Sequence, residues 1–309
     1  MTQNTRINPM AKMIGIYNNK GGVGKTTLAL FLADFLSSVT IKGKKSRVLV
    51  IDFDPQASCC NAILGPEKVG GLRETGKTLP HALKGRREGQ SETDLLEYIF
   101  TRKENLRSKT KKTRLGNLDV IVSEAELALA FEESASMEDV MEMASWIKAS
   151  LSKHYDFIFV DLPGSLSKRN GFSLIGAFLA DYFLVPIEPN RININAIPLT
   201  LKMLNDIRGW RGNKKPFKLL GFVLNKADRR TRQYKLHKDE LVHYAGVASC
   251  KIYENILPPT PKLSNATDDS IQFITLSERY DTYYTHVKKL VLEVIDDLGF
   301  SVKAKQEKP

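Results

Sequence analysis

Short apolar segments bounded by polar turns recur along the chain. They lie at residues 13–17, 47–53, 118–122, 157–161, 182–187 and 219–224. Most are nearly continuous apolar runs, which is typical of strands that are covered on both faces of a sheet. Helical spacing predicts helices between them, at residues 28–38, 93–100, 125–131, 138–151, 174–179 and 197–207. Because strand and helix alternate, we expect an α/β fold with a mostly parallel central β-sheet flanked by helices.

Length and composition fit one large α/β domain or two small ones. The chain has 309 residues, of which 42% are hydrophobic and 26% charged, so it is long enough to bury a full core. We assign residues 13–299 to a single domain, preceded by a polar N-terminal extension at residues 1–12 and followed by a polar C-terminal tail at residues 300–309.

Two basic stretches and a final amphipathic segment stand apart from this alternation. Residues 66–90 and 101–114 are rich in basic residues and poor in apolar ones, so we expect surface loops around a short helix, together a basic insertion at residues 66–115. Residues 282–298 have one apolar face at helical spacing and acidic residues on the polar side. This pattern favours packing on the core over binding to a membrane.

A glycine-rich segment directly follows the first predicted strand. Residues 18–27 read N-N-K-G-G-V-G-K-T-T and lead into a predicted helix. Glycines let successive backbone N–H groups turn toward an anion, and the helix start adds unpaired donors and a positive dipole. Lysine supplies a charge for phosphate, and threonine a hydroxyl for Mg²⁺. The predicted nucleotide-binding residues here are Gly21, Gly22, Val23, Gly24, Lys25, Thr26 and Thr27.

This segment departs from the general phosphate-loop pattern. Asn19 stands where that pattern has glycine, and Lys20 precedes the glycine pair. The resulting K-G-G-x-G-K-T resembles the deviant Walker A motif of the ParA/MinD family of P-loop ATPases. The resemblance implies a P-loop NTPase fold that uses ATP and Mg²⁺, with Lys20 and Lys25 as catalytic residues. It also implies that Lys20 reaches the nucleotide of the other subunit, so that ATP joins two protomers into a homodimer.

Acidic residues follow two later strands. Asp52 and Asp54 belong to V-I-D-F-D-P-Q-A-S, and Asp161 ends F-I-F-V-D. The carboxyl ends of parallel strands meet at one edge, so we expect these carboxylates near the phosphate loop. By resemblance to the family pattern D-x-D-P-Q, Asp52 supports the Mg²⁺ shell, and Asp54 is a catalytic residue that orients the attacking water. Asp161 takes the Walker B position, so Thr26, Asp52 and Asp161 form the predicted metal site, while Gly164 departs from the family's D-x-P-P-S.

The sequence leaves two alternatives for the base of the nucleotide, adenine and guanine. Residues 225–228 read N-K-A-D, which matches the N-K-x-D element with which GTPases read guanine, and Asp228 would accept hydrogen bonds from that base. In the family that the loop resembles, an asparagine such as Asn225 contacts adenine. We predict ATP, with GTP as the alternative. Asn225 is added to the nucleotide-binding residues, and so is Pro258, because I-L-P-P-T-P resembles a family segment that packs near the base.

The charge of the chain favours polyanionic partners. The formal net charge is +11 and the pI is near 9.4. Lysine and arginine contacts to phosphates give DNA binding that is independent of sequence and sensitive to salt, and ParA-type partition ATPases bind nucleoid DNA in this way as ATP dimers. A basic helix that is only solvated is the alternative. The predicted DNA-binding residues are Lys214, Lys215, Lys218, Arg229, Arg230, Arg232, Lys235 and Lys238.

These features together favour a switch that segregates or positions DNA or another cargo. By the same resemblance, a ParB-like or adaptor protein would stimulate its ATPase activity, and the ATP dimer would be nucleoid-associated. The absence of a long apolar run or signal-peptide core predicts a cytoplasmic protein. A MinD-like membrane-associated regulator is the alternative. Relatives of nitrogenase iron protein need paired interfacial cysteines, which Cys59, Cys60 and Cys250 do not supply. A metabolic P-loop ligase is disfavoured because no further substrate motif is evident.

Overall fold

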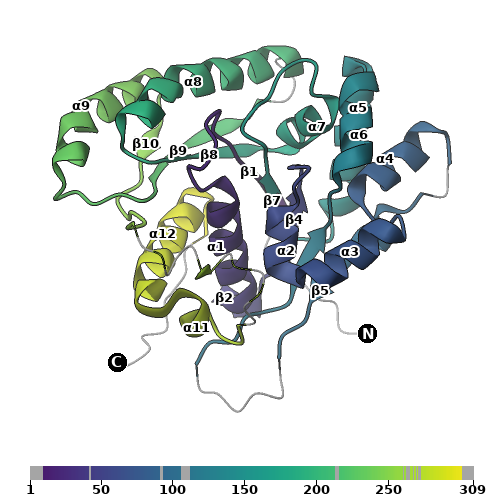
Figure 1. Cartoon of the computed structure of the whole chain (residues 1–309), viewed down its shortest axis with the longest axis horizontal. Coiled ribbons are helices and arrows are strands. Elements are labelled where there is room, and N and C mark those ends of the chain that lie inside the picture. Colours follow the sequence, from purple (N-terminus) through teal and green to yellow (C-terminus); the bar gives the residue numbers. More distant parts are fainter. Residues whose placement is uncertain are drawn as a thin grey trace.

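The computed structural model describes residues 10–41, 43–90, 93–105, 112–212, 216–259, 261, 265, 266, 268, 270 and 273–300. Its main strands are β1 (Lys12–Ile16), β4 (Val48–Asp52), β5 (Ile99–Arg102), β6 (Leu118–Ile121), β7 (Phe157–Asp161), β8 (Tyr182–Ile187), β9 (Lys218–Leu224) and β10 (Lys251–Ile252). They form one sheet in the order β10, β9, β8, β1, β7, β4, β6, β5 (Figure 1). Every neighbouring pair is parallel except β5 with β6, so the predicted fold class is confirmed. A separate hairpin joins β2 (Thr40–Ile41) to β3 (Lys44–Lys45).

Side chains of the central strands point alternately into two apolar layers, one on each face of the sheet. Met13 and Ile14 of β1 enter different layers, as do Ile158 and Phe159 of β7. A strand that is buried on both faces has no polar side, which explains the continuous apolar runs in the sequence. The first layer is covered by α4 (Leu79–Arg87), α5 (Ala125–Ser134), α6 (Met137–Leu151), α7 (Gly171–Leu179), α8 (Arg191–Arg211) and α9 (Arg232–Val247).

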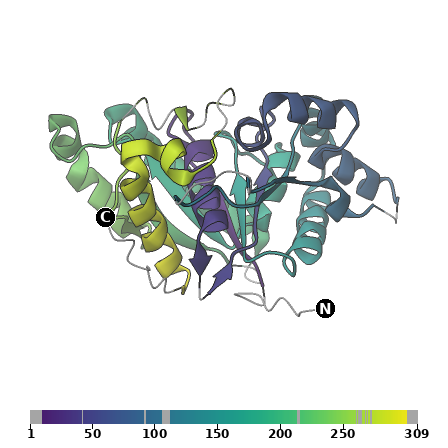
Figure 2. The ribbon, with the colours of Figure 1, turned by 90° about the horizontal axis from the view of Figure 1, so that it is seen from below.

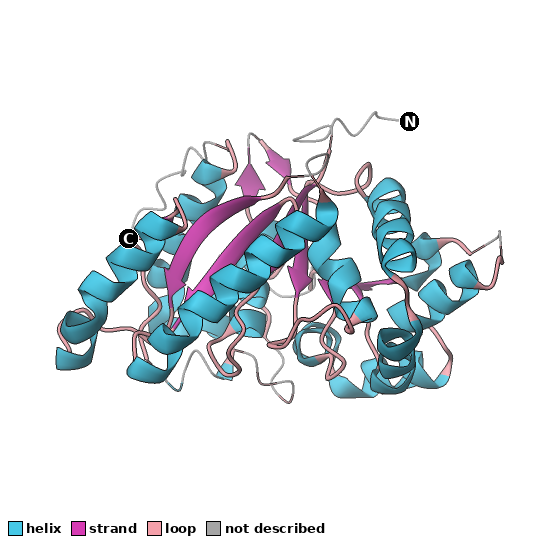
Figure 3. Ribbon diagram, turned by 90° about the horizontal axis from the view of Figure 1, so that it is seen from above, coloured by secondary structure: helices cyan, strands magenta, loops and turns pink. Residues whose placement is uncertain are grey.

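The second layer is covered by α1 (Lys25–Ser38), α2 (Ser58–Leu64), α3 (Pro66–Glu74), α11 (Leu276–Tyr280) and α12 (Tyr284–Asp297). Figure 2 shows α12 beside α1 on this face, where the two helices are in contact. Figure 3 looks at the sheet from the opposite side and shows helices in front of the twisted strands. The result is a three-layer molecule in which β1 and its neighbours are fully enclosed.

The prediction of a surface loop at residues 66–90 was wrong, because α3 and α4 occupy most of this stretch. Pro66 stands in the first turn of α3, where its fixed φ favours a helix and its missing N–H has no partner to lose. Val69 is buried, and so are Leu79, Ala82 and Leu83, which recur at helical spacing on one face of α4. A few well-placed apolar residues are therefore enough to dock two otherwise polar helices.

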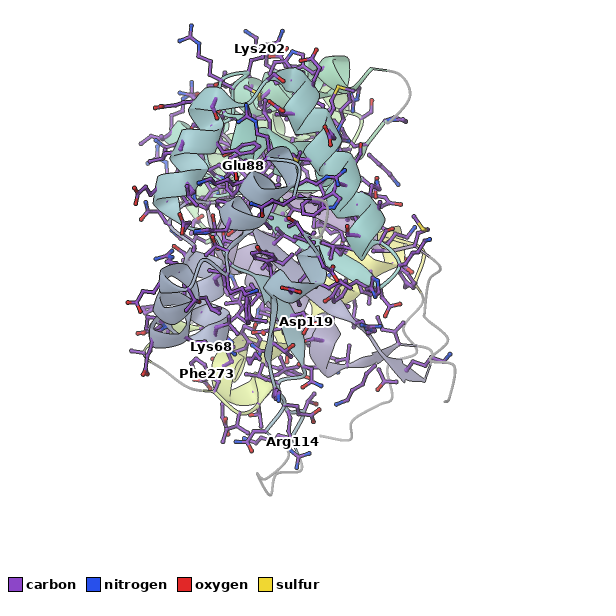
Figure 4. All side chains as sticks on the ribbon, turned by 90° about the vertical axis from the view of Figure 1, so that its right-hand side faces the viewer. Lys68, Glu88, Arg114, Asp119, Lys202 and Phe273 are labelled. Atoms are coloured by element: carbon purple, nitrogen blue, oxygen red, sulfur yellow. The ribbon has the colours of Figure 1, made fainter. Side chains whose placement is uncertain are left out.

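The prediction of a helix at residues 93–100 was also wrong. This segment forms a short 3₁₀ turn, η1 (Leu95–Tyr98), and then the edge strand β5. β5 pairs antiparallel with β6, and the Thr101 hydroxyl donates to Asp119 across the pair. Figure 4 looks onto this side of the molecule and shows Asp119 on β6, with Arg114 toward the opposite end of the view from Lys202 on α8. Residues 106–111, in the second basic stretch, lie outside the described residues.

The last helix, α12, packs on the core. Its side chains Val287, Leu290, Val291 and Val294 are buried against the second layer. The amphipathic pattern thus serves the interior, as the sequence predicted. Phe300, which begins the predicted polar tail, is buried and packs edge-on against Phe157, with ring centroids 5.1 Å apart. None of the helices in the described ranges is both long and apolar enough to cross a membrane.

A buried charge cluster ties α1 to the sheet edge and to α11. Asp34 lies in the middle of the apolar helix α1 and is fully buried. Its Oδ1 accepts a hydrogen bond from Arg102 Nη1 at 2.6 Å, and its Oδ2 accepts one from Tyr280 Oη at 2.9 Å. Arg279 Nη1 lies 3.2 Å from the same Oδ2. One carboxylate therefore joins three elements that are distant in the sequence.

Candidate nucleotide and magnesium site

The predicted site residues converge at the carboxyl ends of the central strands. The register pairs Ile16 of β1 with Asp161 of β7, and Asp161 with Asp52 of β4. The glycine-rich loop leaves β1 at this edge and Asp54 follows β4 by two residues. Ligands of open α/β sheets bind at this edge, beside the point where successive crossovers leave the sheet in opposite directions.

The glycine-rich loop has a backbone that only glycine adopts readily. Gly22 and Gly24 have φ angles of 75° and 90°, in the left-handed region. A Cβ atom on Gly24 would lie only 2.0 Å from Asn225 Nδ2, so the position excludes any side chain. Gly24 is also the N-cap of α1 and supplies no side-chain cap, which leaves the first N–H groups of the helix directed at the loop. Donors in this arrangement are suited to holding phosphate.

The two lysines of the loop differ in burial. Lys25 is only 8% exposed, and its Nζ donates to the carbonyl oxygen of Lys20 at 3.2 Å. Burial lowers the pKa of Lys25, while the nearby carboxylates of Asp161 and Asp54 oppose that change. Lys20 is exposed, and its backbone N–H is held by Asn18 Oδ1 at 2.8 Å. Lys25 thus points into the site, and Lys20 lies at the surface of the loop.

Asp52 and Asp161 form a buried pair of carboxylates. Asp52 accepts hydrogen bonds from the backbone N–H groups of Asp54, Cys59 and Cys60, at 3.0, 3.2 and 3.3 Å. Burial and then the charge of Asp161 raise the pKa of Asp52 well above its usual range. Burial likewise raises the pKa of Asp161 to about 7. A cation bound between two such groups would favour the charged form of both.

The donor set fits Mg²⁺. Neither carboxylate oxygen of Asp161 accepts a well-formed hydrogen bond within the described part of the chain, although the Thr26 hydroxyl is close enough to limit the rise in its pKa. Mg²⁺ usually takes one or two carboxylates and completes its shell with water and phosphate oxygens. No group of three or more His, Cys, Asp or Glu residues suited to a metal occurs in the described ranges. Asp161, Asp52 and Thr26 would therefore hold the ion together with a bound phosphate chain.

The loop is held in place by residues that the sequence did not single out. Asn18 Nδ2 donates to the carbonyl oxygen of Pro186 at 2.8 Å, which fixes the loop to β8. Thr200 of α8 accepts from the N–H of Asn19 at 3.1 Å and lies 3.2 Å from Asn18 Oδ1. A buried asparagine beside a glycine-rich loop is a usable sequence signal. Thr200, 181 residues from Asn19, carries none.

The predicted base-contacting residues lie together next to the loop. Asn225 is buried and its Nδ2 donates to the carbonyl oxygen of Val23 at 2.8 Å, so its amide braces the loop. Hydrogen bonds of the Leu257 backbone to Leu224 and Ala227 place Pro258 beside this segment. A cavity of about 240 Å³ adjoins it and is lined by Glu188, Pro189, Lys226, Asp228, Thr231, Gln233 and Pro259.

Acidic residues of α12 support this part of the site. Glu293 accepts from the backbone N–H groups of Glu254 and Asn255, at 2.9 and 3.1 Å, just before Pro258. Glu293 and Asp297 also form ion pairs with Lys251 of β10. The acidic residues that distinguish α12 from a cationic membrane helix therefore anchor the segment leading to Pro258.

The structure separates the predicted DNA-binding residues into groups. Arg232, Lys235 and Lys238 are exposed along α9. Arg229 donates to the carbonyl oxygen of Glu254, and Arg230 pairs with Asp228. Lys218 begins β9 and lines a cavity with residues 247–249 at the C-terminal end of α9. A helix of 16 residues is about 24 Å long, so Lys218 lies far from the basic residues at the start of α9. Lys214 and Lys215 lie outside the described residues.

Comparisons with known proteins agree with the geometry. The sequence model of the family described as "AAA domain" matches residues 11–215. An uncharacterized protein of Methanocaldococcus jannaschii is 32% identical over 222 residues, which are 71% of this chain and 75% of that protein. The chromosome-partitioning ATPase Soj of Treponema pallidum is 27% identical over 257 residues, 83% of this chain and 87% of Soj.

A solved structure is similar to this chain over nearly its whole length. Apo McdA of Cyanothece superposes with a TM-score of 0.69 at 21% identity, over 94% of this chain and 100% of McdA. The family match spans more than half of the chain, and the deviant loop and paired carboxylates lie within it. The chain therefore belongs to the AAA-domain family and, within it, to the ParA-type ATPases.

Proposed function

We propose that this ATPase is a nucleotide-dependent switch that dimerises around ATP and Mg²⁺, binds DNA without sequence preference as a dimer, and segregates or positions a cargo. The observation that carries the proposal is the opposite placement of two lysines in one loop. Lys25 is buried beside Asp54 and Asp161, whereas Lys20 is exposed and takes part in no ion pair among the described residues. A lysine outside its own phosphate cradle is placed to contact phosphate held by a second copy of the chain.

Each protein group then has a task in hydrolysis. Lys25 and the N–H groups at the start of α1 hold the phosphate chain, and Asp54 orients the attacking water from the end of the β4 segment. When bound, Mg²⁺ neutralises charge on the phosphates and would be held by Thr26, Asp52 and Asp161. Asp54 is partly exposed, so its carboxylate is accessible to water, while its Oδ1 is oriented by the N–H of Gln56 at 3.0 Å.

The decisive experiment separates binding from dimerisation. Wild type and the Lys20→Ala variant are compared with a non-hydrolysable ATP analogue and Mg²⁺, measuring affinity by titration and mass by light scattering. We expect the variant to bind the analogue yet stay monomeric. Lys68→Ala, which removes an exposed lysine from α3, is the matched control and should dimerise normally. An unchanged nucleotide-dependent dimer in Lys20→Ala would rule out the role of Lys20 between subunits.

Hydrolysis has its own test. The Asp54→Ala variant should hydrolyse ATP at a small fraction of the wild-type rate while still forming the dimer, since the side chain orients water and holds no phosphate. Normal turnover in this variant would remove Asp54 from the mechanism. A ParB-like or adaptor protein is the proposed stimulator, and it should raise the rate of wild type and leave Asp54→Ala slow.

DNA binding is proposed for the exposed basic residues of α9. Retention on DNA should require nucleotide and fall steeply with salt, because lysine and arginine side chains that bind phosphates release counterions. Replacing Arg232 or Lys235 with alanine should reduce the salt slope by about 1 for each side chain removed, with similar weakening on DNA of any sequence. Binding that is equally strong without nucleotide would contradict the switch. A cytoplasmic, nucleoid-associated location follows from this proposal and is tested by imaging the tagged chain in cells.

A further inference from the structure

Two residues of the N-K-A-D segment, Lys226 and Asp228, line the cavity beside the phosphate loop, together with Glu188, Pro189, Thr231, Gln233 and Pro259. Asn225 bonds to the carbonyl oxygen of Val23, and Lys226 Nζ donates to that of Gly22 at 3.0 Å. Asp228, three residues after Asn225, lines the cavity of about 240 Å³ together with Lys226. The segment that braces the phosphate cradle thus also presents a carboxylate to a space large enough for a purine base. This inference rests on the proposed nucleotide site.

The carboxylate of Asp228 is already occupied within the chain. Its Oδ1 accepts from the backbone N and the Nε of Arg230, at 2.9 and 3.0 Å, and its Oδ2 accepts from Nη2 at 2.8 Å. These hydrogen bonds hold the pKa of Asp228 at about 2, so the group is charged at neutral pH. The Arg230 side chain is 91% exposed, and that of Asp228 is 27% exposed. Asp228 and Arg230 therefore form a solvent-accessible ion pair outside the core.

The two purines make different demands on such a carboxylate. Guanine presents two adjacent donors, the N1–H and the 2-amino group, which match the two oxygens of a free carboxylate. Adenine presents an unprotonated N1, whose lone pair a free carboxylate repels. We propose that Arg230 sets the base selectivity of this ATPase by occupying Asp228, which removes an acceptor for guanine and masks a negative charge from adenine.

The test compares ATP and GTP affinities of the full chain by competition against a fluorescent ATP analogue. In Arg230→Ala, the affinity for GTP relative to ATP should rise by about tenfold over wild type, the effect of a bidentate base contact. Adding Asp228→Ala to that variant should remove the gain, because the acceptor is lost. Lys202→Ala, which deletes an exposed positive charge on α8, should leave the ratio unchanged.

The outcomes distinguish this inference from the function it rests on. If wild type binds neither nucleotide, the nucleotide site itself is refuted and the role of Arg230 with it. If wild type binds ATP and the ratio in Arg230→Ala stays within twofold, the site stands and Arg230 does not set selectivity. A gain that survives in the double variant would show that Asp228 is not the acceptor, which also overturns the proposal.

Discussion

Replacing Asp34 with asparagine is expected to destabilise the whole domain. The carboxylate is fully buried, accepts hydrogen bonds from Arg102 and Tyr280, and pairs with Arg279. The asparagine amide keeps the shape of the side chain but turns one oxygen into a donor that faces another donor. Removing one partner of a buried ion pair costs about 3–5 kcal/mol, because the remaining charge is left uncompensated. That is a large fraction of the roughly 5–15 kcal/mol that stabilises a typical domain.

Urea denaturation followed by far-UV circular dichroism measures this loss at pH 7. The midpoint should fall without a change in slope, and the melting temperature should drop by about 6–10 °C. Asp239→Asn, an equally isosteric change at an exposed position on α9, serves as the control and should alter stability by less than about 0.5 kcal/mol. A loss below about 1 kcal/mol in Asp34→Asn would show that the cluster is solvated or its charges already relaxed, and would refute the reasoning.

The pH dependence of the stability difference between wild type and Asp34→Asn is a second measurement. Burial by itself would raise the pKa of Asp34, but the charges of Arg102 and Arg279 outweigh it and hold the pKa below its usual value. A carboxyl group with a lowered pKa contributes its stability fully above the unfolded-state pKa, about 3.9, and loses it as the pH falls through the folded-state value. The difference in the free energy of unfolding between wild type and Asp34→Asn should therefore be constant near neutral pH and become smaller below about pH 4.

Three further changes test the frame of the site. Gly24→Ala should weaken ATP binding more than tenfold, measured by titration, because its Cβ would collide with Asn225 at 2.0 Å and its φ of 90° disfavours alanine. Thr200→Val should cost about 1 kcal/mol in urea denaturation, since the N–H of Asn19 loses its acceptor, while Thr200→Ser should restore it. Glu293→Ala should cost about 2 kcal/mol and reduce nucleotide affinity, because two backbone N–H groups before Pro258 lose a charged acceptor. Unchanged nucleotide affinity in Glu293→Ala would show that α12 does not support the nucleotide site.

The sequence predicts most of the sheet because its strands have a pattern of their own. A run such as 157–161 is apolar at every position but its last, and it becomes β7 with the same bounds. Residues 66–90 and 93–100 were assigned wrongly for the opposite reason. Residues 66–90 contain few apolar residues, whereas the short apolar run in 93–100 fits a helix as well as a strand. Only contact with the core decides that Val69 and Leu83 are buried or that Ile99 enters an edge strand.

The site shows a similar division. Lys25 is identifiable in the sequence because phosphate binding requires a local arrangement of glycines and lysine at a helix start. Thr200 and Glu293 act through hydrogen bonds to segments far along the chain, and neither stands in a motif. Asp34 is an acidic residue in an otherwise apolar helix, and nothing in the local pattern indicates that Arg279 and Tyr280 contact it.

The central position of β1 has a consequence for the order in which this protein is able to assemble. The loop after β1 is synthesised well before the residues that hold it, because Pro186 follows Asn18 by 168 residues and Asn225 follows Val23 by 202 residues. Contacts of such long range slow folding and leave apolar strands uncovered in the meantime. ATP and Mg²⁺, which need the closed loop, would favour only chains that have completed the sheet, and so would draw late intermediates toward the native state.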